Sequence, residues 1–204
     1  MTEKSRREGA DGPETVRREV IQAYRARYAR TFRRRWGVDA PGRRVKRVAF
    51  VHGGPQDGET GRRRAQLEAR GAAVGEWWPA SVHPPAIEEE WHAMLLLIGE
   101  PEEEGARRRL SRSLVLGVGR GALVAAAPPA VPFLAREGLL RGRRAACPPA
   151  DEEEIVRHGA SPAGSPLARD GVFLTCSAWE RVPELIRSLL DLLHPARQEG
   201  ASER

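Results

Sequence analysis

The chain has 204 residues, 40% of them hydrophobic, and a formal net charge of +6 at pH 7. This length is enough for one domain with a substantial core and an appendage. Apolar runs are too short to cross a bilayer and the polar N-terminus lacks the apolar segment of a secretory signal, so we expect neither feature. The two cysteines, Cys147 and Cys176, are too few for a disulfide framework, which favours a cytoplasmic protein.

Positive charge is concentrated at the N-terminus. Residues 1–47 hold fifteen Lys or Arg and six Asp or Glu, a net charge of +9, so the remainder carries a net charge of −3. Residues 14–36 predict one long helix, because apolar side chains recur every four residues along it: Val16, Val20, Tyr24, Tyr28, Phe32 and Trp36. We therefore predict a basic helical arm and linker over residues 1–45, an α/β domain over residues 46–194 and a loose tail over residues 195–204.

The arm has two possible uses. Its aromatic stripe can dock on its own domain or across a homodimer interface, which buries the apolar side chains. Alternatively, residues 14–47 can bind nucleic acid or an anionic membrane surface through their arginines. We expect docking, with Tyr24, Tyr28 and Phe32 buried, because it accounts for the stripe and leaves the arginines in water.

Strands and helices alternate after the arm. Apolar runs predict strands over residues 48–51, 72–78 and 93–98, with a helix over residues 59–70. The acidic run 102–104 and the basic run 107–109 either pair along one short helix or form a solvated surface. A final amphipathic helix is predicted from apolar residues at i, i+3, i+4, i+7, i+8 and i+11: Val182, Leu185, Ile186, Leu189, Leu190 and Leu193. This alternation predicts a doubly wound, flavodoxin-like, three-layer parallel sheet, with its site at the carboxyl ends of the strands.

Residues 114–127, LVLGVGRGALVAAA, are predicted to form the centre of the domain. The first five form an apolar run typical of a buried strand, Gly119-Arg120-Gly121 predicts a tight turn, and residues 122–127 resemble a helix start. Strand, turn and helix in this order form a nucleophile elbow, whose tip carries a nucleophilic side chain. Here the tip is Gly119, so an ordinary strand-to-helix turn is the alternative interpretation.

Two segments in the second half of the chain are specific enough to compare with known families: residues 135–147, AREGLLRGRRAAC, and residues 170–175, DGVFLT. They resemble the A-x-A-G-L-L-x-G-R-x-A-T segment and the D-G-N-L-I-T strand of the ThiJ/PfpI family of intracellular-protease-like proteins, whose fold is related to class I glutamine amidotransferases. Residues 151–160 resemble its acidic helix and G-A turn, and residues 48–74 fit its first strand, loop, helix and second strand without a gap. The resemblance covers about residues 46–193 and implies the family's fold.

The resemblance also implies a thiol site, from which this sequence departs. Glu59 falls on the family's acidic pocket residue, but Gly119 takes the place of its nucleophilic cysteine and Pro148 the place of its frequent histidine. Glu100 replaces the second glycine of a pair that helps to form an anion pocket. A carboxylate there opposes stabilisation of an oxyanion, although Arg120 could partly neutralise it.

These departures predict a domain that has lost the family's thiol chemistry and serves as a binding or assembly module. One alternative is a glyoxalase-like, deglycase-like or hydrolase enzyme with relocated catalytic residues; a second is a nucleic-acid-associated protein that acts through the arm. The histidines and cysteines show no metal-ligand spacing, and we predict no cofactor. The candidate pocket residues are Glu59, Gly119, Arg120, Glu100, His52 and Cys147.

Overall fold

The structure is a computed structural model, and it describes residues 46–53, 58–78 and 91–194. The predicted arm, with Tyr24, Tyr28 and Phe32, and the predicted tail lie outside these ranges. The described strands are β1 (Lys46–Val51), β2 (Ala72–Trp77), β3 (Ala93–Leu96), β4 (Leu123–Ala126), β5 (Arg144–Ala145), β6 (Ser161–Pro162), β7 (Leu167–Asp170) and β8 (Phe173–Cys176). The α-helices are α2 (Gly58–Ala69), α3 (Glu104–Arg120), α4 (Ala130–Arg136), α5 (Glu152–Arg157) and α6 (Val182–Leu193), and Pro149–Asp151 and Trp179–Arg181 form 3-10 turns.

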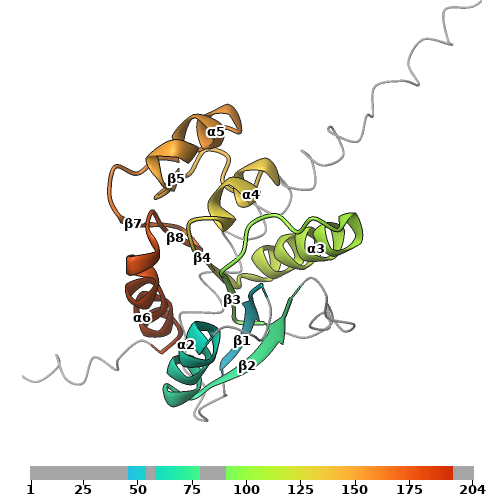
Figure 1. Ribbon diagram of the computed structural model, residues 1–204, viewed down its shortest axis with the longest axis vertical. Helices are drawn as coiled ribbons and strands as arrows, with labels where there is room; N and C mark the ends of the chain where they lie inside the picture. The colour runs from blue at the N-terminus through green and yellow to red at the C-terminus, as the bar shows by residue number, and fades with distance from the viewer. Residues whose placement is uncertain (1–45, 54–57, 79–90, 195–204) are drawn as a thin grey trace, which may run out of the picture.

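Six strands form one sheet in the order β2-β1-β3-β4-β8-β7. The first five of these are parallel to one another, and only β7, at one edge, runs antiparallel to its neighbour β8. The short strands β5 and β6 pair separately and lie with α5 at one end of the molecule (Figure 1). The doubly wound, flavodoxin-like sheet predicted from the sequence is therefore confirmed, with an antiparallel strand added at its edge.

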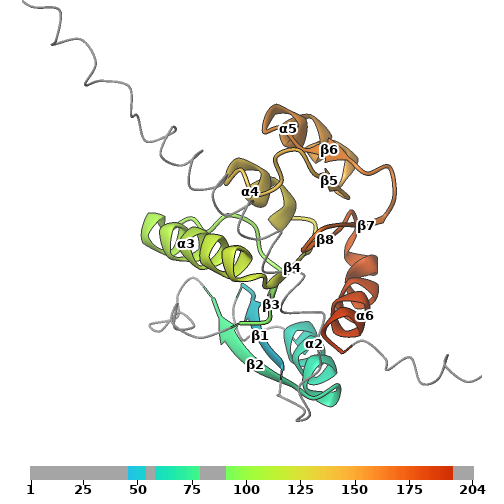
Figure 2. The same ribbon diagram turned by 180° about the vertical axis from the view of Figure 1, so that it is seen from behind.

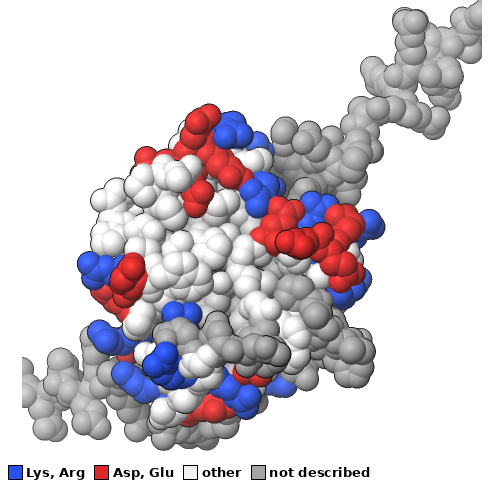
Figure 3. Space-filling model, viewed as in Figure 1, with Lys and Arg blue, Asp and Glu red and all other residues white. Residues whose placement is uncertain are grey.

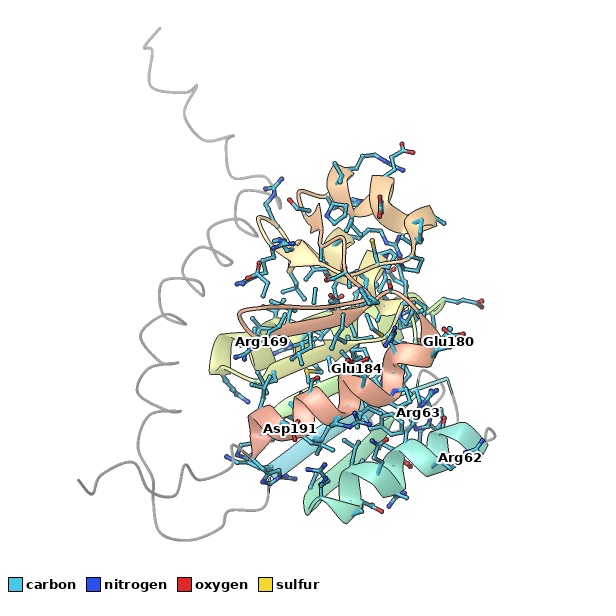
Figure 4. The ribbon with its side chains drawn as sticks, turned by 90° about the vertical axis from the view of Figure 1, so that its left-hand side faces the viewer. Arg62, Arg63, Arg169, Glu180, Glu184 and Asp191 are labelled. Atoms are coloured by element: carbon cyan, nitrogen blue, oxygen red, sulfur yellow. The ribbon has the colours of Figure 1, made fainter. Side chains whose placement is uncertain are left out.

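Helices cover both faces of this sheet. Helices α2 and α6 lie on one face, and α3 lies on the other, as the two opposite views show (Figures 1 and 2). Figure 4 shows α2 and α6 side by side, with Arg62 and Arg63 on α2 and Glu184 on α6. The guanidinium of Arg63 lies 5.3 Å from the centre of the Trp179 ring, which links α2 to the turn that precedes α6.

The core lies between the sheet and these helices. Strand β1 from Val48 onward and strands β3 and β4 are apolar and buried, and β8 adds only Thr175, because helices cover both faces of these strands. Helix α6 buries every apolar position that the sequence predicted for it, so that prediction is confirmed. The predicted bounds of β1, α2, β2 and β3 differ from the observed bounds by no more than two residues.

The prediction for residues 114–127 is wrong. Residues 114–120 form the second half of helix α3, and residues 123–126, predicted as a helix start, form strand β4. Gly119 and Arg120 belong to the last turn of α3, and the tight turn that follows is the C-cap at Gly121, where φ is 88°. The nucleophile elbow predicted at Gly119 therefore does not exist at that position.

The run 114–118 is helical because it continues the spacing of the residues before it. Four buried positions, Ala106, Leu110, Leu114 and Gly117, follow the i+4, i+8, i+11 spacing of a helix packed on a sheet. Gly117 allows close packing, since a Cβ there would lie 3.1 Å from the sulfur of Met94 on β3. Arg108 pairs with Glu104 at 2.9 Å, and both side chains are more than half exposed, so the two runs pair within this longer helix and also form a solvated surface.

Candidate functional site

The parallel strands end along one edge of the sheet, called here the carboxyl edge; the opposite edge, where they begin, is the amino edge. His52 follows β1, and Gly99 and Glu100 follow β3, so these residues lie at the carboxyl edge as predicted. Ser177, which follows β8, lies at the same edge. Gly119 and Arg120 end α3 just before β4 begins, which places them at the amino edge. They are not part of the site.

The turn at the carboxyl end of β4 is made of Ala127, Pro128 and Pro129. The N–H of Ala127 donates to the carbonyl of Leu96 (2.9 Å), which continues the pairing with β3, and the N–H of Ala130 donates to the carbonyl of Ala127 (3.0 Å). Proline suits the position before a helix, because its fixed φ is close to the helical value and it has no N–H to satisfy. This strand-to-helix turn, rather than the one at Gly119, occupies the elbow position, and none of its three residues has a nucleophilic side chain.

The loop after β3 packs directly against this turn. A Cβ built on Gly99 would lie 2.8 Å from the carbonyl oxygen of Pro129, closer than real Cβ atoms approach oxygen. Glycine is therefore required at this position for close packing, although its φ is not positive. Gly53, after β1, lies beside Ile98 at an ordinary contact distance, with 3.7 Å between its Cβ position and Cγ2 of Ile98. These contacts join the ends of β1, β3 and β4 into one surface.

Glu100 is held by two arginines from neighbouring helices. Its carboxylate accepts from Arg107 of α3 at 2.8 Å and pairs with Arg136 of α4 at 2.9 Å, and Arg136 also pairs with Glu154 of α5. The hydrogen bond from Arg107 and the positive charge of both arginines lower the pKa of Glu100, against a smaller opposing effect of burial. The negative charge predicted at this position is thus neutralised by Arg107 and Arg136, and the predicted role of Arg120 is wrong.

His52 is buried at the end of β1. Its backbone N–H donates to the backbone carbonyl of Trp77 at 3.0 Å. The centre of its ring lies 5.1 Å from the ring centre of Phe50 and 5.4 Å from that of Trp78. The ring is therefore packed between two aromatic side chains. The carboxyl edge is therefore aromatic where β1 and β2 end.

Cys147 follows β5, in the segment that packs over the end of β8. The neighbouring N–H of Ala146 donates to Oγ1 of Thr175 at 2.7 Å, and Thr175 pairs in register with Ala126 at the end of β4. Burial raises the pKa of the Cys147 thiol to about 11, and the negative charges of Glu152 and Asp151 add to the increase. The structure thus brings Cys147 to the carboxyl edge but in a form that is protonated at neutral pH.

The second thiol, Cys176, lies at the end of β8. It is fully buried, and its Sγ lies 3.8 Å from the carbonyl oxygen of Ala126. Burial raises its pKa to about 11 as well, although the backbone of Ala178 and the charge of Arg63 act in the opposite direction. Both thiols are poor nucleophiles at neutral pH, because the reactive form of cysteine is the thiolate.

Glu59 is the second residue of α2, as the sequence predicted, and its side chain lies outside the described part of the chain. Helix α2 connects the end of β1 with the start of β2, so it begins at the carboxyl edge. Gly119 lies at the amino edge. The prediction that Glu59 shares a pocket with a turn at Gly119 is therefore wrong.

Sequence analysis also missed residues that shape this edge. The Pro128-Pro129 pair after an apolar run is a signal for the end of a strand and the start of a helix, and it should have placed β4 at residues 123–126. Arg107 and Arg136 could not be assigned to Glu100, because the contact joins three elements. Thr175 was assigned only to a strand, whereas its hydroxyl accepts the N–H of Ala146 in the core.

Charged residues are gathered in separate groups on the face of the molecule that Figure 3 shows. Figure 3 shows acidic and basic side chains gathered over the start of α3 and over α5, with uncharged surface between these groups and α6. Within the described ranges, no group of three or more His, Cys, Asp and Glu side chains is arranged to hold a metal ion. Of the helices in the same ranges, none is both long enough and apolar enough to cross a membrane.

Comparison with solved structures identifies the fold. The chain superimposes on a ThiJ/PfpI domain protein from Brachyspira murdochii with a TM-score of 0.59 and 15% identity, over 75% of this chain and 99% of the other. A DJ-1 superfamily protein from Salmonella typhimurium gives a TM-score of 0.61 and 17% identity, over 76% of this chain and 93% of the other. An AraC family transcriptional regulator from Pseudomonas putida gives a TM-score of 0.59 and 12% identity, over 73% and 92%.

No protein-family model and no curated protein matches the sequence. The chain therefore has the fold of the ThiJ/PfpI and DJ-1 proteins, and the resemblance found in the sequence is confirmed at the level of the fold. At identities of this size, the likeness concerns the fold and not the chemistry of the site.

Proposed function

We propose that the chain is a ThiJ/PfpI-like domain that has lost the family's thiol chemistry and acts as a non-catalytic binding or assembly module. The observation that carries this proposal is the turn between β4 and α4. It holds Ala127, Pro128 and Pro129, where an elbow would present a nucleophile at the start of a helix. Proline and alanine offer no atom that can attack a carbonyl group.

The two cysteines support the same conclusion. A catalytic thiol has a lowered pKa, through a helix N-terminus, a nearby cation or a histidine partner. Burial instead raises the pKa of Cys147 and of Cys176 to about 11. Cys147 also lies just before Asp151 and Glu152, whose negative charges disfavour a thiolate.

The ion pairs of Glu100 argue against an oxyanion site at the loop after β3. An anion pocket needs hydrogen-bond donors that are directed at a developing negative charge. Here the carboxylate of Glu100 already lies in this loop, and it forms ion pairs with Arg107 and Arg136. The two arginines beside this loop are therefore already paired within the protein.

A turnover assay tests the proposal. We expect the purified full-length chain to consume methylglyoxal no faster than a buffer blank, with the Cys147→Ser variant giving the same result. Turnover well above the blank that is abolished by Cys147→Ser or Glu59→Gln would show relocated chemistry and contradict the proposal. Cys176→Ser serves as the matched control, because it changes the other buried thiol at a position farther into the core.

A further inference from the structure

Residues 114–119 of helix α3 are apolar on all sides of the helix. Residues 114–119 contain no polar side chain, whereas the first half of α3 carries charged residues such as Arg108 and Arg112 on its outer side. Leu114 and Gly117 face the core and are buried. The remaining residues of this stretch are partly exposed: Val115, Leu116, Val118 and Gly119.

Leu116 defines the outer side of this stretch. It is two residues from Leu114, about 200° around the helix, so it points away from the sheet on which Leu114 packs. Val115 and Val118 touch the margin of the core, but among the described residues Leu116 is not part of it. A helix that lies on the surface normally has polar residues on this side, and an apolar patch there marks a contact. We call Val115, Leu116, Val118 and Gly119 the α3 patch.

The N-terminal arm enters the domain close to the α3 patch. The N–H of His92 donates to the carbonyl of Arg47 at 2.9 Å, and the N–H of Leu123 donates to the carbonyl of His92 at 3.0 Å. The starts of β1, β3 and β4 are therefore adjacent at the amino edge, where α3 also ends. Strand spacing puts the start of β1 about 10 Å from that of β4. The nine residues 37–45 can span up to about 30 Å, so they reach the patch with length to spare.

We propose that residues 14–36 of the same chain pack the aromatic side of their predicted helix against the α3 patch. The stripe from Tyr24 to Phe32 spans about 12 Å along a helix, and the apolar half of α3 is of similar length, about 9 Å. Both surfaces are apolar over two turns. This contact is independent of the proposed loss of thiol chemistry.

Charge distinguishes this contact from nucleic-acid binding. The arm is basic, and α3 carries Arg112 and Arg120 beside the patch, so like charges oppose the contact while apolar burial favours it. Added salt screens the repulsion between exposed charges, and we expect it to strengthen the contact. Binding of the arginines to nucleic acid would instead weaken as salt is added, because the release of counterions into a more concentrated salt solution gains less entropy.

Labelling of an introduced thiol tests the proposal on the full chain. In Leu116→Cys, the new thiol replaces a partly exposed side chain, whereas Cys147 and Cys176 are buried, have raised pKa values and react slowly. The labelling rate with a maleimide is compared between the native arm and an arm in which Tyr24, Tyr28 and Phe32 are all serine. Val156→Cys is the matched control, since Val156 on α5 is another apolar residue, 53% exposed, and lies away from α3.

We expect the serine arm to raise the labelling rate at position 116 about tenfold, which corresponds to a patch covered for roughly nine-tenths of the time. The rate at position 156 should not change. With the native arm, labelling at position 116 should slow further as salt is raised. Labelling at 116 that is equally fast with both arms would overturn the proposal, as would slow labelling that the serine arm leaves unchanged. In the latter case, a mass in light scattering that falls on dilution would assign the cover to a second copy of the chain.

Discussion

Gly99→Ala tests the geometry of the carboxyl edge most sharply, because the structure predicts its sign. A Cβ at this position would lie 2.8 Å from the carbonyl oxygen of Pro129 and 3.5 Å from its carbonyl carbon. The neighbouring atoms are backbone atoms, so the loop after β3 or the turn after β4 must move. Overpacking of this kind destabilises the folded protein by about 1–3 kcal/mol. Alanine also lowers the conformational entropy of the unfolded chain, but this stabilises the protein by only about 0.4–1 kcal/mol. The net expectation is a loss of about 1–2 kcal/mol.

Gly61→Ala is the matched control, since it makes the same chemical change with the opposite expected result. Gly61 lies in α2, and a Cβ there would meet nothing within 4 Å. Alanine in a helix is favoured over glycine by about 0.5–1 kcal/mol. For a domain of this size each kcal/mol shifts Tm by about 2–4 °C. We therefore expect differential scanning calorimetry to give a lower Tm for Gly99→Ala and a higher Tm for Gly61→Ala. If both variants melt above the native protein, the close approach of Gly99 to Pro129 is refuted.

Two further predictions concern polar contacts at the same edge. Thr175→Val should lower the free energy of unfolding by about 1–3 kcal/mol in urea titrations, because the buried N–H of Ala146 loses its acceptor. Thr175→Ser keeps a hydroxyl and should lower this free energy much less. Equal decreases for the two variants would contradict the hydrogen bond. Ionic contacts lower the pKa of Glu100 in the folded protein, so its stabilising effect is present above the ordinary carboxyl pKa and is lost as pH falls through the lowered value. The difference in Tm between the native protein and Glu100→Gln should therefore shrink in acid, while Glu153→Gln, at a side chain 86% exposed, should differ little from the native protein at any pH. A difference in Tm between the native protein and Glu100→Gln that persists at the lowest pH would contradict a stabilising role for the charge of Glu100.

The sequence predicted helices and strands correctly where the pattern of apolar residues fitted only one type of element. The spacing of Val182, Leu185 and Ile186 fits only a helix with one buried side, and α6 buries them as predicted. Strands β1 and β3 were also predicted, because short runs without polar breaks between turn residues suit a strand covered on both faces. The order of these elements was enough to predict the doubly wound sheet.

The pattern failed where an apolar run was short and preceded by charged residues. Periodicity over five residues does not separate a buried strand from the end of a helix, and the buried spacing from Ala106 to Leu114 becomes visible only when the charged first half is included. Because the end of α3 was predicted as a strand, the elbow was expected at Gly119, whereas the corresponding turn follows β4. The ion pairs of Glu100 could not be predicted, because they depend on how α3 and α4 pack around one loop.

The pH dependence of thiol alkylation tests the loss of thiol chemistry most directly. A thiol with a pKa of about 11 is ionised in roughly one molecule in ten thousand at pH 7, and this fraction rises about tenfold for each pH unit. In the full-length protein, iodoacetamide should therefore modify Cys147 and Cys176 slowly at pH 7, with rates that still rise at pH 10, as mass spectrometry of the labelled peptides would show. A rate at either cysteine that is fast at pH 7 and level above it would reveal an activated thiol and contradict the proposal.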